Sequence, residues 1–144
     1  MKNENKIKLF LVDDDAVFLK LLEIEFLVHG DFEIETYPTG ESCIENISHN
    51  PDIVILDYNL DGIDRDAING IKTLDSIKSF NPDISVVMLS SQDRIDVAIN
   101  CMHHQATDYV VKSETAFMRL QKIIDTILEL KKMKKQLNWY MDRM

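Results

Sequence analysis

Two kinds of segment alternate along the chain: short apolar runs, and longer stretches whose apolar residues recur every three or four positions. The short runs predict buried strands, and the longer stretches predict helices that cover them. The predicted strands are residues 7–12, 32–37, 53–56, 84–89 and 107–111. The predicted helices are residues 16–30, a stretch from Thr39 or Ser42 to about Ser48, residues 67–80, residues 93–104, and a long stretch from Glu114 to about Met144.

Strands and helices in this order predict an α/β protein with a (βα)5 chain. Because most of the strands are continuously apolar, we expect a five-stranded parallel sheet buried under helices on both faces, which is the doubly wound arrangement. A helix from Glu114 to Met144 would be about 46 Å long, more than one such domain needs. We therefore expect one domain over residues 1–130 and a protruding continuation of the last helix over residues 131–144.

The last helix carries a second periodic pattern. Its apolar residues follow alternating spacings of three and four, with Lys134 in the one polar slot, and this is a heptad seam. The seam consists of Leu120, Ile123, Ile127, Leu130, Leu137, Met141 and Met144. Part of the stripe must pack on the sheet. The rest is expected either to pair with a second copy as a coiled coil, giving a homodimer, or to lead into an output domain absent from this chain.

Composition narrows the class of protein. A hydrophobic content of 45% predicts a globular chain, and two distant cysteines, Cys43 and Cys101, favour neither a disulfide framework nor a zinc site. This cysteine usage makes a reducing cytoplasm the expected compartment. No apolar run approaches the roughly 20 residues that cross a membrane. Residues 1–112 hold nine Lys and Arg against 21 Asp and Glu, so direct nucleic-acid binding is not expected. The basic run at 131–135 could touch nucleic acid or a membrane, but it is interpreted as a solvated helix face.

Polar residues follow four of the predicted strands. Asp13, Asp14 and Asp15 follow the first strand and Asp57 the third; Ser90 and Ser91 follow the fourth and Lys112 the fifth. Ligands of doubly wound sheets bind outside the carboxyl ends of the strands, where the strand order reverses. Converging carboxylates need a cation, and a hard divalent ion such as Mg²⁺ fits oxygen ligands. A carboxylate can also act as a phosphoryl nucleophile, while lysine and serine bind phosphoryl oxygens.

The stretch DYNLDG, residues 57–62, has a second interpretation. Its D-x-N-x-D-G pattern is the first half of a calcium-binding loop. The twelfth position is Ile68, where such a loop requires a bidentate glutamate, and the eighth is Asp64, where it requires an apolar residue. A strand, not a helix, is predicted before Asp57. The pattern is therefore better interpreted as a strand-end acid followed by a turn.

Four segments in order, IKLFLVDDD, PDIVILDYNLDG, VVMLSS and TDYVVK, resemble the signature segments of bacterial two-component response-regulator receiver domains. The resemblance extends from residue 6 to about residue 130. It implies the flavodoxin-like form of the (βα)5 fold and a phosphoacceptor switch with at most slow self-dephosphorylation, not an enzyme. It also implies a sensor histidine kinase or a phosphotransfer protein as partner, and a protein-interaction surface that responds to phosphorylation.

The resemblance assigns a metal and acceptor role to four residues. Asp57 would be the phosphoacceptor and one of the ligands of Mg²⁺. Asp13 and Asp14 would be the acidic pair that binds Mg²⁺ directly or through water. Asn59 would contribute its backbone carbonyl to the metal, and its position is one of two that tune hydrolysis of the acyl phosphate in this family.

The remaining roles fall on residues of the last two strands. Ser90 and Lys112 would contact the phosphoryl oxygens, although Ser91 competes for the first of these roles. Tyr109 would be the switch aromatic, which turns inward when Ser90 moves, with a core aromatic as the alternative. Gln92 would be the second hydrolysis-tuning residue. Asp15 is interpreted as a helix cap.

The sequence departs from the receiver pattern at three places. Gly70 lies thirteen residues after Asp57, where eight is usual, so about five extra residues lie within 61–69, and an aspartate replaces the usual proline at position 61. The acids of this insertion would alter metal affinity, shield the acyl phosphate or determine which partner binds. Alternatively, the insertion is a tolerated surface loop. Ser113 replaces a proline often joined by a cis bond, so the Lys112–Ser113 peptide is either trans in a re-routed loop or a costly cis bond. Gln105 stands where a glycine is common.

Two alternatives to a working receiver remain. One is an interaction-only receiver, which keeps the fold and has lost the chemistry; the Ser113 and insertion departures motivate it. The other is a phosphatase of the haloacid-dehalogenase type, which also uses a strand-end aspartate with Mg²⁺. Such enzymes carry a second acid two residues after the nucleophile, and Asn59 fills that place here. The phosphatase is therefore disfavoured.

Overall fold

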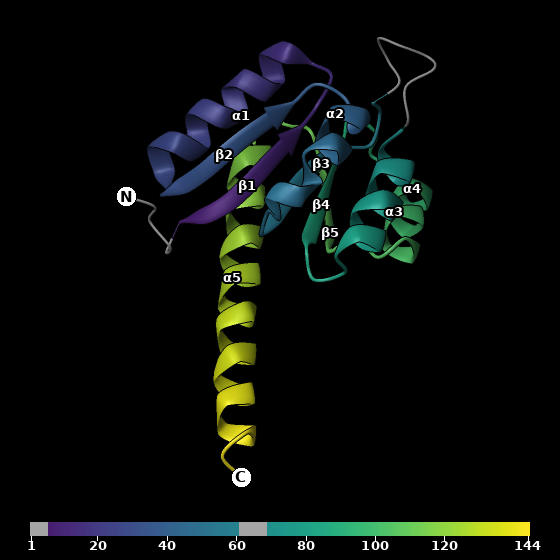
Figure 1. The fold of residues 1–144 in the computed structure, drawn as a ribbon. Helices are drawn as coiled ribbons and strands as arrows, with labels where there is room; N and C mark the ends of the chain where they lie inside the picture. Colours follow the sequence, from purple (N-terminus) through teal and green to yellow (C-terminus); the bar gives the residue numbers. More distant parts are fainter. Residues whose placement is uncertain (1–5, 61–68) are drawn as a thin grey trace.

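Five strands form one parallel sheet in the order β2-β1-β3-β4-β5 (Figure 1). The structure, a computed structural model, describes residues 6–60 and 69–144. The strands are β1 (Ile7–Val12), β2 (Phe32–Tyr37), β3 (Ile53–Asp57), β4 (Ser85–Ser90) and β5 (Asp108–Val111). The helices are α1 (Ala16–His29), α2 (Gly40–Glu45), α3 (Gly70–Phe80), α4 (Ile95–His103) and α5 (Ala116–Met141), with a short 3-10 turn at Ile47–His49.

The strand order reverses between β1 and β3, which are neighbours in the sheet. β1 pairs in parallel with β2 on one side and with β3 on the other, so later strands add on the far side of β3. The carboxyl ends of β1 and β3 therefore meet at the point where a doubly wound sheet opens its binding crevice. The predicted (βα)5 flavodoxin-like fold is confirmed.

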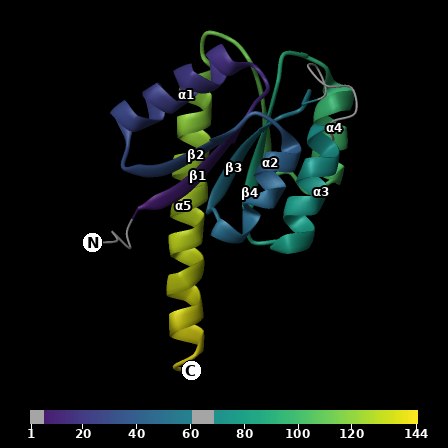
Figure 2. The same ribbon diagram turned by 45° about the horizontal axis from the view of Figure 1, so that its top comes forward.

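Helices cover both faces of the sheet. α1 and α5 lie on one face, and α2, α3 and α4 lie on the other (Figure 2). Alternate residues of each strand enter the two cores: Leu11 packs with Phe26 and Leu120 under α1 and α5, while Phe10 packs with Leu74 under the opposite helices. Each fully buried side chain of this size stabilises the fold by about 1.5–3 kcal/mol.

Side-chain caps define where three helices begin. Asp15 caps α1 by accepting from the backbone N–H groups of Val17 and Phe18, so its predicted capping role is confirmed. Thr39 and Ser42, the two candidates for the start of the second helix, act together as a capping box at α2. Asn69 caps α3 by accepting from Lys72.

The structure corrects some predicted boundaries. The second helix ends at Glu45 and not near Ser48, because a 3-10 turn follows it. The last helix begins at Ala116 and ends at Met141, two or three residues inside its predicted limits. β1 and β2 have their predicted bounds, and the other boundaries differ from prediction by no more than two residues. The predicted start of the third helix lies outside the described residues.

Two of the three sequence departures lie within the described residues. No cis peptide occurs in the described chain, so the Lys112–Ser113 bond is trans. Gln105 has a φ of 72°, the left-handed conformation that glycine adopts without cost. The turn before β5 therefore keeps a glycine-like shape although glycine is absent. The third departure, the insertion with its acids at 61, 64 and 66, lies almost entirely outside the described residues, as does position 68 of the calcium alternative.

The last helix extends well past the sheet (Figure 1). Its first half is buried through Leu120, Ile124 and Ile127, whereas from Lys132 onward every residue is exposed. Lys131 lies where α5 changes from packed to exposed, and its Nζ donates to the backbone carbonyl of Asp52, 3.0 Å away. Among the described helices, none combines the length and the apolar character needed to cross a membrane.

Candidate functional site

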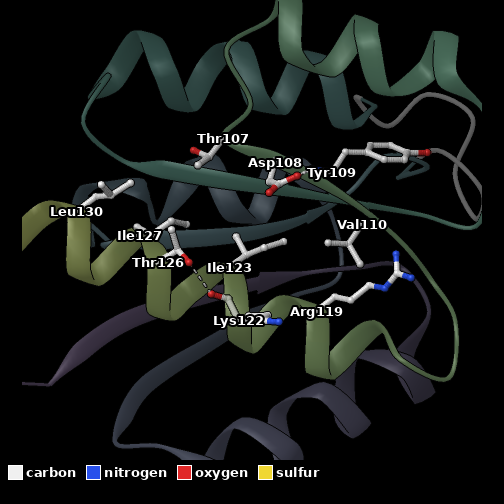
Figure 3. A pocket seen from close by; sticks show the side chains of 10 residues that line it. All are labelled: Thr107, Asp108, Tyr109, Val110, Arg119, Lys122, Ile123, Thr126, Ile127 and Leu130. Atoms are coloured by element: carbon white, nitrogen blue, oxygen red, sulfur yellow. Dashed lines mark hydrogen bonds between the residues drawn. The ribbon is translucent and has the colours of Figure 1, made fainter.

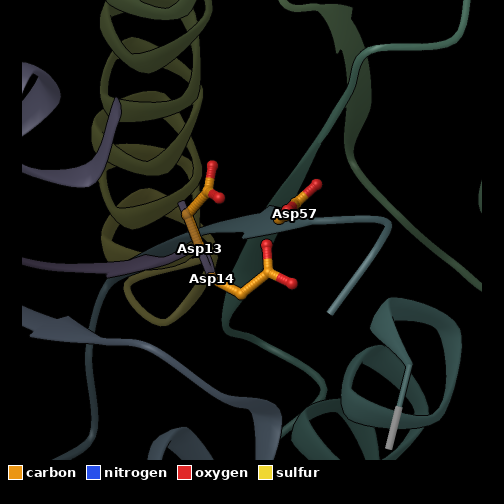
Figure 4. A group of neighbouring side chains, drawn as sticks. All are labelled: Asp13, Asp14 and Asp57. Atoms are coloured by element: carbon orange, nitrogen blue, oxygen red, sulfur yellow. The ribbon is translucent and has the colours of Figure 1, made fainter. Parts of the chain in front are cut away.

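Three carboxyl groups gather where β1 and β3 end. Asp13 directly follows β1, Asp14 comes next, and Asp57 is the last residue of β3 (Figure 4). One oxygen from each lies within 4.8 Å of the others. Asp13 and Asp57 are only 1% and 2% exposed, whereas Asp14 is half-buried. The three acids predicted to form the metal site are thus brought together.

Backbone N–H groups hold two of these carboxylates in place. Asp13 Oδ1 accepts from the N–H of Asp15 at 2.9 Å, and Asp57 Oδ1 accepts from the N–H of Asn59 at 3.2 Å. One oxygen of each carboxylate is therefore used by the protein itself. The other oxygen, Oδ2, is left to interact with a cation or a ligand.

Lys112 supplies the positive charge of the site. Its Nζ lies 2.8 Å from Asp13 Oδ2 and 3.5 Å from Asp57 Oδ2. Its backbone N–H donates to the carbonyl of Ser90, which fixes the chain at the end of β5 beside β4. The trans Lys112–Ser113 peptide therefore does not prevent the lysine from reaching the acids.

The electrostatics of the cluster favour a further cation. Burial, and then repulsion by Asp13, raise the pKa of Asp57 above its usual range, and attraction to Lys112 offsets this only in part. Burial opposes the charge on Lys112, but Asp13 and Asp57 outweigh it and raise the pKa of the lysine. Among the described residues, the three carboxylates, once ionised, exceed the one ammonium by two negative charges, which one divalent cation would neutralise.

One buried oxygen also remains short of partners. Within residues 6–60 and 69–144, no hydrogen bond of good geometry reaches Asp13 Oδ2, although the ammonium of Lys112 lies beside it. An acceptor buried in this way is costly unless something binds it. Oxygen ligands, excess negative charge and an under-used buried oxygen together fit a hard divalent cation such as Mg²⁺. The residues present can thus hold a metal.

Ser90, Gln92 and Tyr109 form a second group beside the acids. Ser90 is buried at the end of β4, and its Oγ accepts from the N–H of Gln92 at 3.0 Å. The Tyr109 hydroxyl donates to the carbonyl of Gln92 at 2.5 Å. The half-buried ring points along the sheet away from α5 (Figure 3) and packs against the core beneath α2, α3 and α4. The backbone of Gln92 therefore links the serine to the tyrosine.

Sequence reasoning missed two residues that shape the site. The ring of Phe18 lies 4.7 Å from Lys112 Nζ, a cation–π contact that helical spacing alone gives no reason to expect. Gly70 starts α3 against the backbone of β3: a Cβ there would lie 2.5 Å from the carbonyl oxygen of Asp57. Its position as the first glycine after the insertion was the one sequence signal for this close approach of α3 to β3.

Sequence reasoning also missed an exposed apolar stripe on α1. Val17, Leu21, Ile24 and Val28 lie on the solvent side of this helix, opposite the buried Phe26. A helix that is apolar all round does not reveal from its sequence which face is free. The stripe begins two residues after Asp15, beside the acidic cluster.

Comparisons with known proteins point to one family. Residues 9–125 match the family described as the response regulator receiver domain. NtrX from Brucella abortus superposes with a TM-score of 0.81 at 28% identity, over 95% of this chain and 30% of NtrX.

Two curated relatives each match more than two thirds of the chain. Protein-glutamate methylesterase/protein-glutamine glutaminase 2 of Rhodopseudomonas palustris is 35% identical over 114 residues, which are 77% of this chain and 30% of that protein. LuxO of Vibrio cholerae is 29% identical over 100 residues, which are 69% of this chain and 21% of LuxO. The chain therefore spans less than a third of the length of these two relatives. It belongs to the response regulator receiver domain family, whose members are phosphoacceptor switches and not classical enzymes.

Proposed function

We propose that Asp57 accepts a phosphoryl group from a sensor histidine kinase or a phosphotransfer protein, with Mg²⁺ as cofactor, and that this switches a protein-interaction surface. One observation carries the proposal. The Asp57 carboxylate lies buried at the reversal of strand order, with Asp13, Asp14 and the Lys112 ammonium around it. A carboxylate that only capped a helix would not need a lysine after β5 and two acids after β1 beside it.

The transfer step is a displacement at phosphorus. An oxygen of Asp57 forms the new P–O bond while the bond from phosphorus to the donor imidazole nitrogen breaks, and the imidazole leaves with the electron pair and takes a proton. Lys112, already 3.5 Å from Asp57 Oδ2, would bind a phosphoryl oxygen, and Ser90 would donate to another. When bound by Asp13, Asp14, Asp57 and the Asn59 carbonyl, Mg²⁺ would offset the charge that develops on the transferred group.

The Ser90–Gln92–Tyr109 connection supports the switching step. If Ser90 Oγ turns to a phosphoryl group on Asp57, it gives up its hydrogen bond from the Gln92 N–H. The loop that carries the Gln92 carbonyl is then freed to move, and with it the acceptor of the Tyr109 hydroxyl. Tyr109 is accordingly the switch aromatic in this proposal. The side chain of Gln92, together with the Asn59 position, would control access of the water that hydrolyses the acyl phosphate.

The apolar stripe of α1 supports a protein donor. A donor imidazole must approach Asp57 from the open edge of the sheet, and the exposed residues Val17 and Leu21 lie next to that edge. An exposed apolar surface of this kind is typical of a protein-interaction site. The cysteines are buried free thiols, which supports a cytoplasmic location for the exchange. Residues 1–130 would form the receiver domain, and residues 131–144 its helical continuation.

Intact-mass spectrometry tests the acceptor directly. We expect acetyl phosphate or phosphoramidate with Mg²⁺ to add about 80 Da to the wild-type chain. Asp57→Asn should add nothing, and neither should the wild type in EDTA. Asp93→Asn, an exposed acid in the loop after β4, is the matched control and should behave as wild type. A wild-type chain that stays unmodified with both donors and with a phosphorylated phosphotransfer protein would overturn the proposal in favour of an interaction-only receiver.

A further inference from the structure

The distal part of α5 exposes apolar side chains that no described residue covers. Met133, Leu137, Tyr140 and Met141 are 54%, 59%, 62% and 61% exposed. A solvated helix needs none of these residues, because a polar surface would serve it better. The stripe therefore indicates a surface that is covered when the protein is assembled.

The stripe continues the seam that holds α5 against the sheet. In heptad terms, Leu120, Ile127, Lys134 and Met141 are a positions, and Ile123, Leu130, Leu137 and Met144 are d positions. The seam is buried at Leu120 and Ile127 and exposed from Leu130 onward. Tyr140 and Met133 are g positions, at the flank of the same seam. A partner helix of matching heptad pattern would cover both kinds of position, and a second copy of this chain has that pattern.

Lys134 distinguishes the two orientations of such a pair. In a parallel pair each a residue faces its own copy, so Lys134 would lie against the partner's Lys134. In an antiparallel pair a residues lie beside d residues, and Lys134 would lie beside the partner's Leu137. Its aliphatic stem can then cover the leucine while its ammonium stays in water.

The residues that flank the seam also favour the antiparallel pair. In the parallel pair Met133 would lie beside the polar side chain of the partner's Asn138. In the antiparallel register set by Lys134, Met133 lies beside the partner's Tyr140, and Leu130 lies beside the partner's Met141. The antiparallel pair therefore buries all four of the exposed residues, whereas the parallel pair places two ammonium groups in contact.

We infer that this chain dimerises through α5 in antiparallel orientation, with Lys134 beside the partner's Leu137. In this register the partner's Met144 comes beside Ile127, at the groove of about 650 Å³ between α5 and β5 (Figure 3). Ile123 and Leu130 line one wall of that groove, and Tyr109 stands on the strand opposite. The dimer does not require phosphorylation of Asp57, so its failure would leave the proposed function untouched.

Light scattering of the full chain tests whether the dimer exists. We expect the mass of a dimer for the wild type, and a loss of affinity of about tenfold or more for Leu137→Asp, because it places a charge within the apolar seam. Lys132→Asp changes charge at an exposed position outside the seam of the same helix and should remain dimeric. A monomeric wild type would overturn the inference.

Cysteine cross-linking tests the orientation without altering Lys134. Isotopically labelled Leu130→Cys is mixed with unlabelled Met141→Cys and oxidised, with the wild type as control for the buried Cys43 and Cys101. The antiparallel pair predicts mixed disulfides between the two variants above the statistical share. Disulfides only within each variant would show the parallel pair and overturn the inference.

Discussion

Lys112 Nζ lies 2.8 Å from Asp13 Oδ2, so the ammonium is paired with the acidic cluster before any phosphoryl group arrives. Removing the lysine would leave the acids unopposed. We expect Lys112→Ala to lower the free energy of unfolding in EDTA by about 2–4 kcal/mol, since it breaks a largely buried ion pair. Mg²⁺ should recover more stability in the variant than in the wild type. Urea denaturation with and without Mg²⁺ measures both effects.

The exposed Lys72 on α3 offers the control for this experiment. Lys72→Ala removes the same charge without touching the cluster, so its stability should stay within about 0.5 kcal/mol of wild type. An equal loss in the two variants, or no larger gain from Mg²⁺ in Lys112→Ala, would contradict the electrostatic account of the site.

The raised pKa of Asp57 predicts how stability depends on pH. Because the folded protein holds this proton more tightly than the unfolded chain, its contribution is present at low pH and is lost as the pH rises from the ordinary value near 3.8 toward about 7. Asp57→Asn has no such group to ionise. In EDTA its free energy of unfolding should match that of the wild type near pH 4 and exceed it by about 1–3 kcal/mol above pH 7.

Thermal unfolding across this pH range, in EDTA and in Mg²⁺, is the measurement. Saturating Mg²⁺ should narrow the difference in stability between Asp57→Asn and the wild type at high pH, because only the wild type has the full set of ligands that lets the metal stabilise it. A wild type whose stability rises from pH 4 to pH 7 relative to Asp57→Asn would show that the carboxylate is stabilised when ionised, contrary to the structure.

Much of the site could be predicted because the fold is regular. Parallel strands place their carboxyl ends at one edge, so residues that follow β1, β3 and β5 had to converge once those strands were recognised. Asp13, Asp57 and Lys112 met in this way, and Asp15 capped a helix as its position indicated.

What could not be predicted depends on side-chain direction and loop geometry. Periodicity placed Phe18 on a helix but could not show that its ring meets Lys112, because α1 carries apolar residues on both its buried and its exposed side. The bond from Tyr109 to the Gln92 carbonyl joins two segments whose approach is set by the loop after β4. The trans Lys112–Ser113 bond lies in a different loop, the one after β5, and the residue types alone did not decide between cis and trans.

The bond between Tyr109 and the Gln92 carbonyl should hold the loop after β4 in its present position. We expect Tyr109→Phe to cost about 1 kcal/mol of stability and to speed amide hydrogen exchange at residues 91–94, because a part-buried carbonyl loses its donor. Tyr140→Phe, which removes a hydroxyl from the distal part of α5 and keeps the ring, should leave exchange at residues 91–94 unchanged. Equal exchange in Tyr109→Phe and wild type would mean that the hydroxyl does not restrain the loop.

Gln105 should be replaceable with a gain in stability. Its φ of 72° strains a residue with a Cβ, and its side chain is exposed, so Gln105→Gly relieves strain without removing packing. The gain is expected to be about 0.5–1 kcal/mol after the extra chain entropy of glycine is subtracted. Glu129→Gly, at an exposed helical position, should instead lower the stability. Denaturant midpoints compare the two, and a loss of stability in Gln105→Gly would refute the strain.

Gly70 allows α3 to begin directly against the strand that carries the acceptor. A Cβ at this position would lie 2.5 Å from the carbonyl oxygen of Asp57 and 2.7 Å from the Cα of Tyr58, and neither backbone atom can move without moving the end of β3. We expect Gly70→Ala to cost about 1–3 kcal/mol of stability and to slow phosphorylation by acetyl phosphate, because Asp57 is displaced from Lys112. Gly30→Ala is the matched control: its Cβ would meet the Phe32 ring, at the opposite end of the sheet from Asp57. It should lower stability while leaving the phosphorylation rate of the folded protein unchanged, and equal rates in both variants would show that Gly70 serves packing alone.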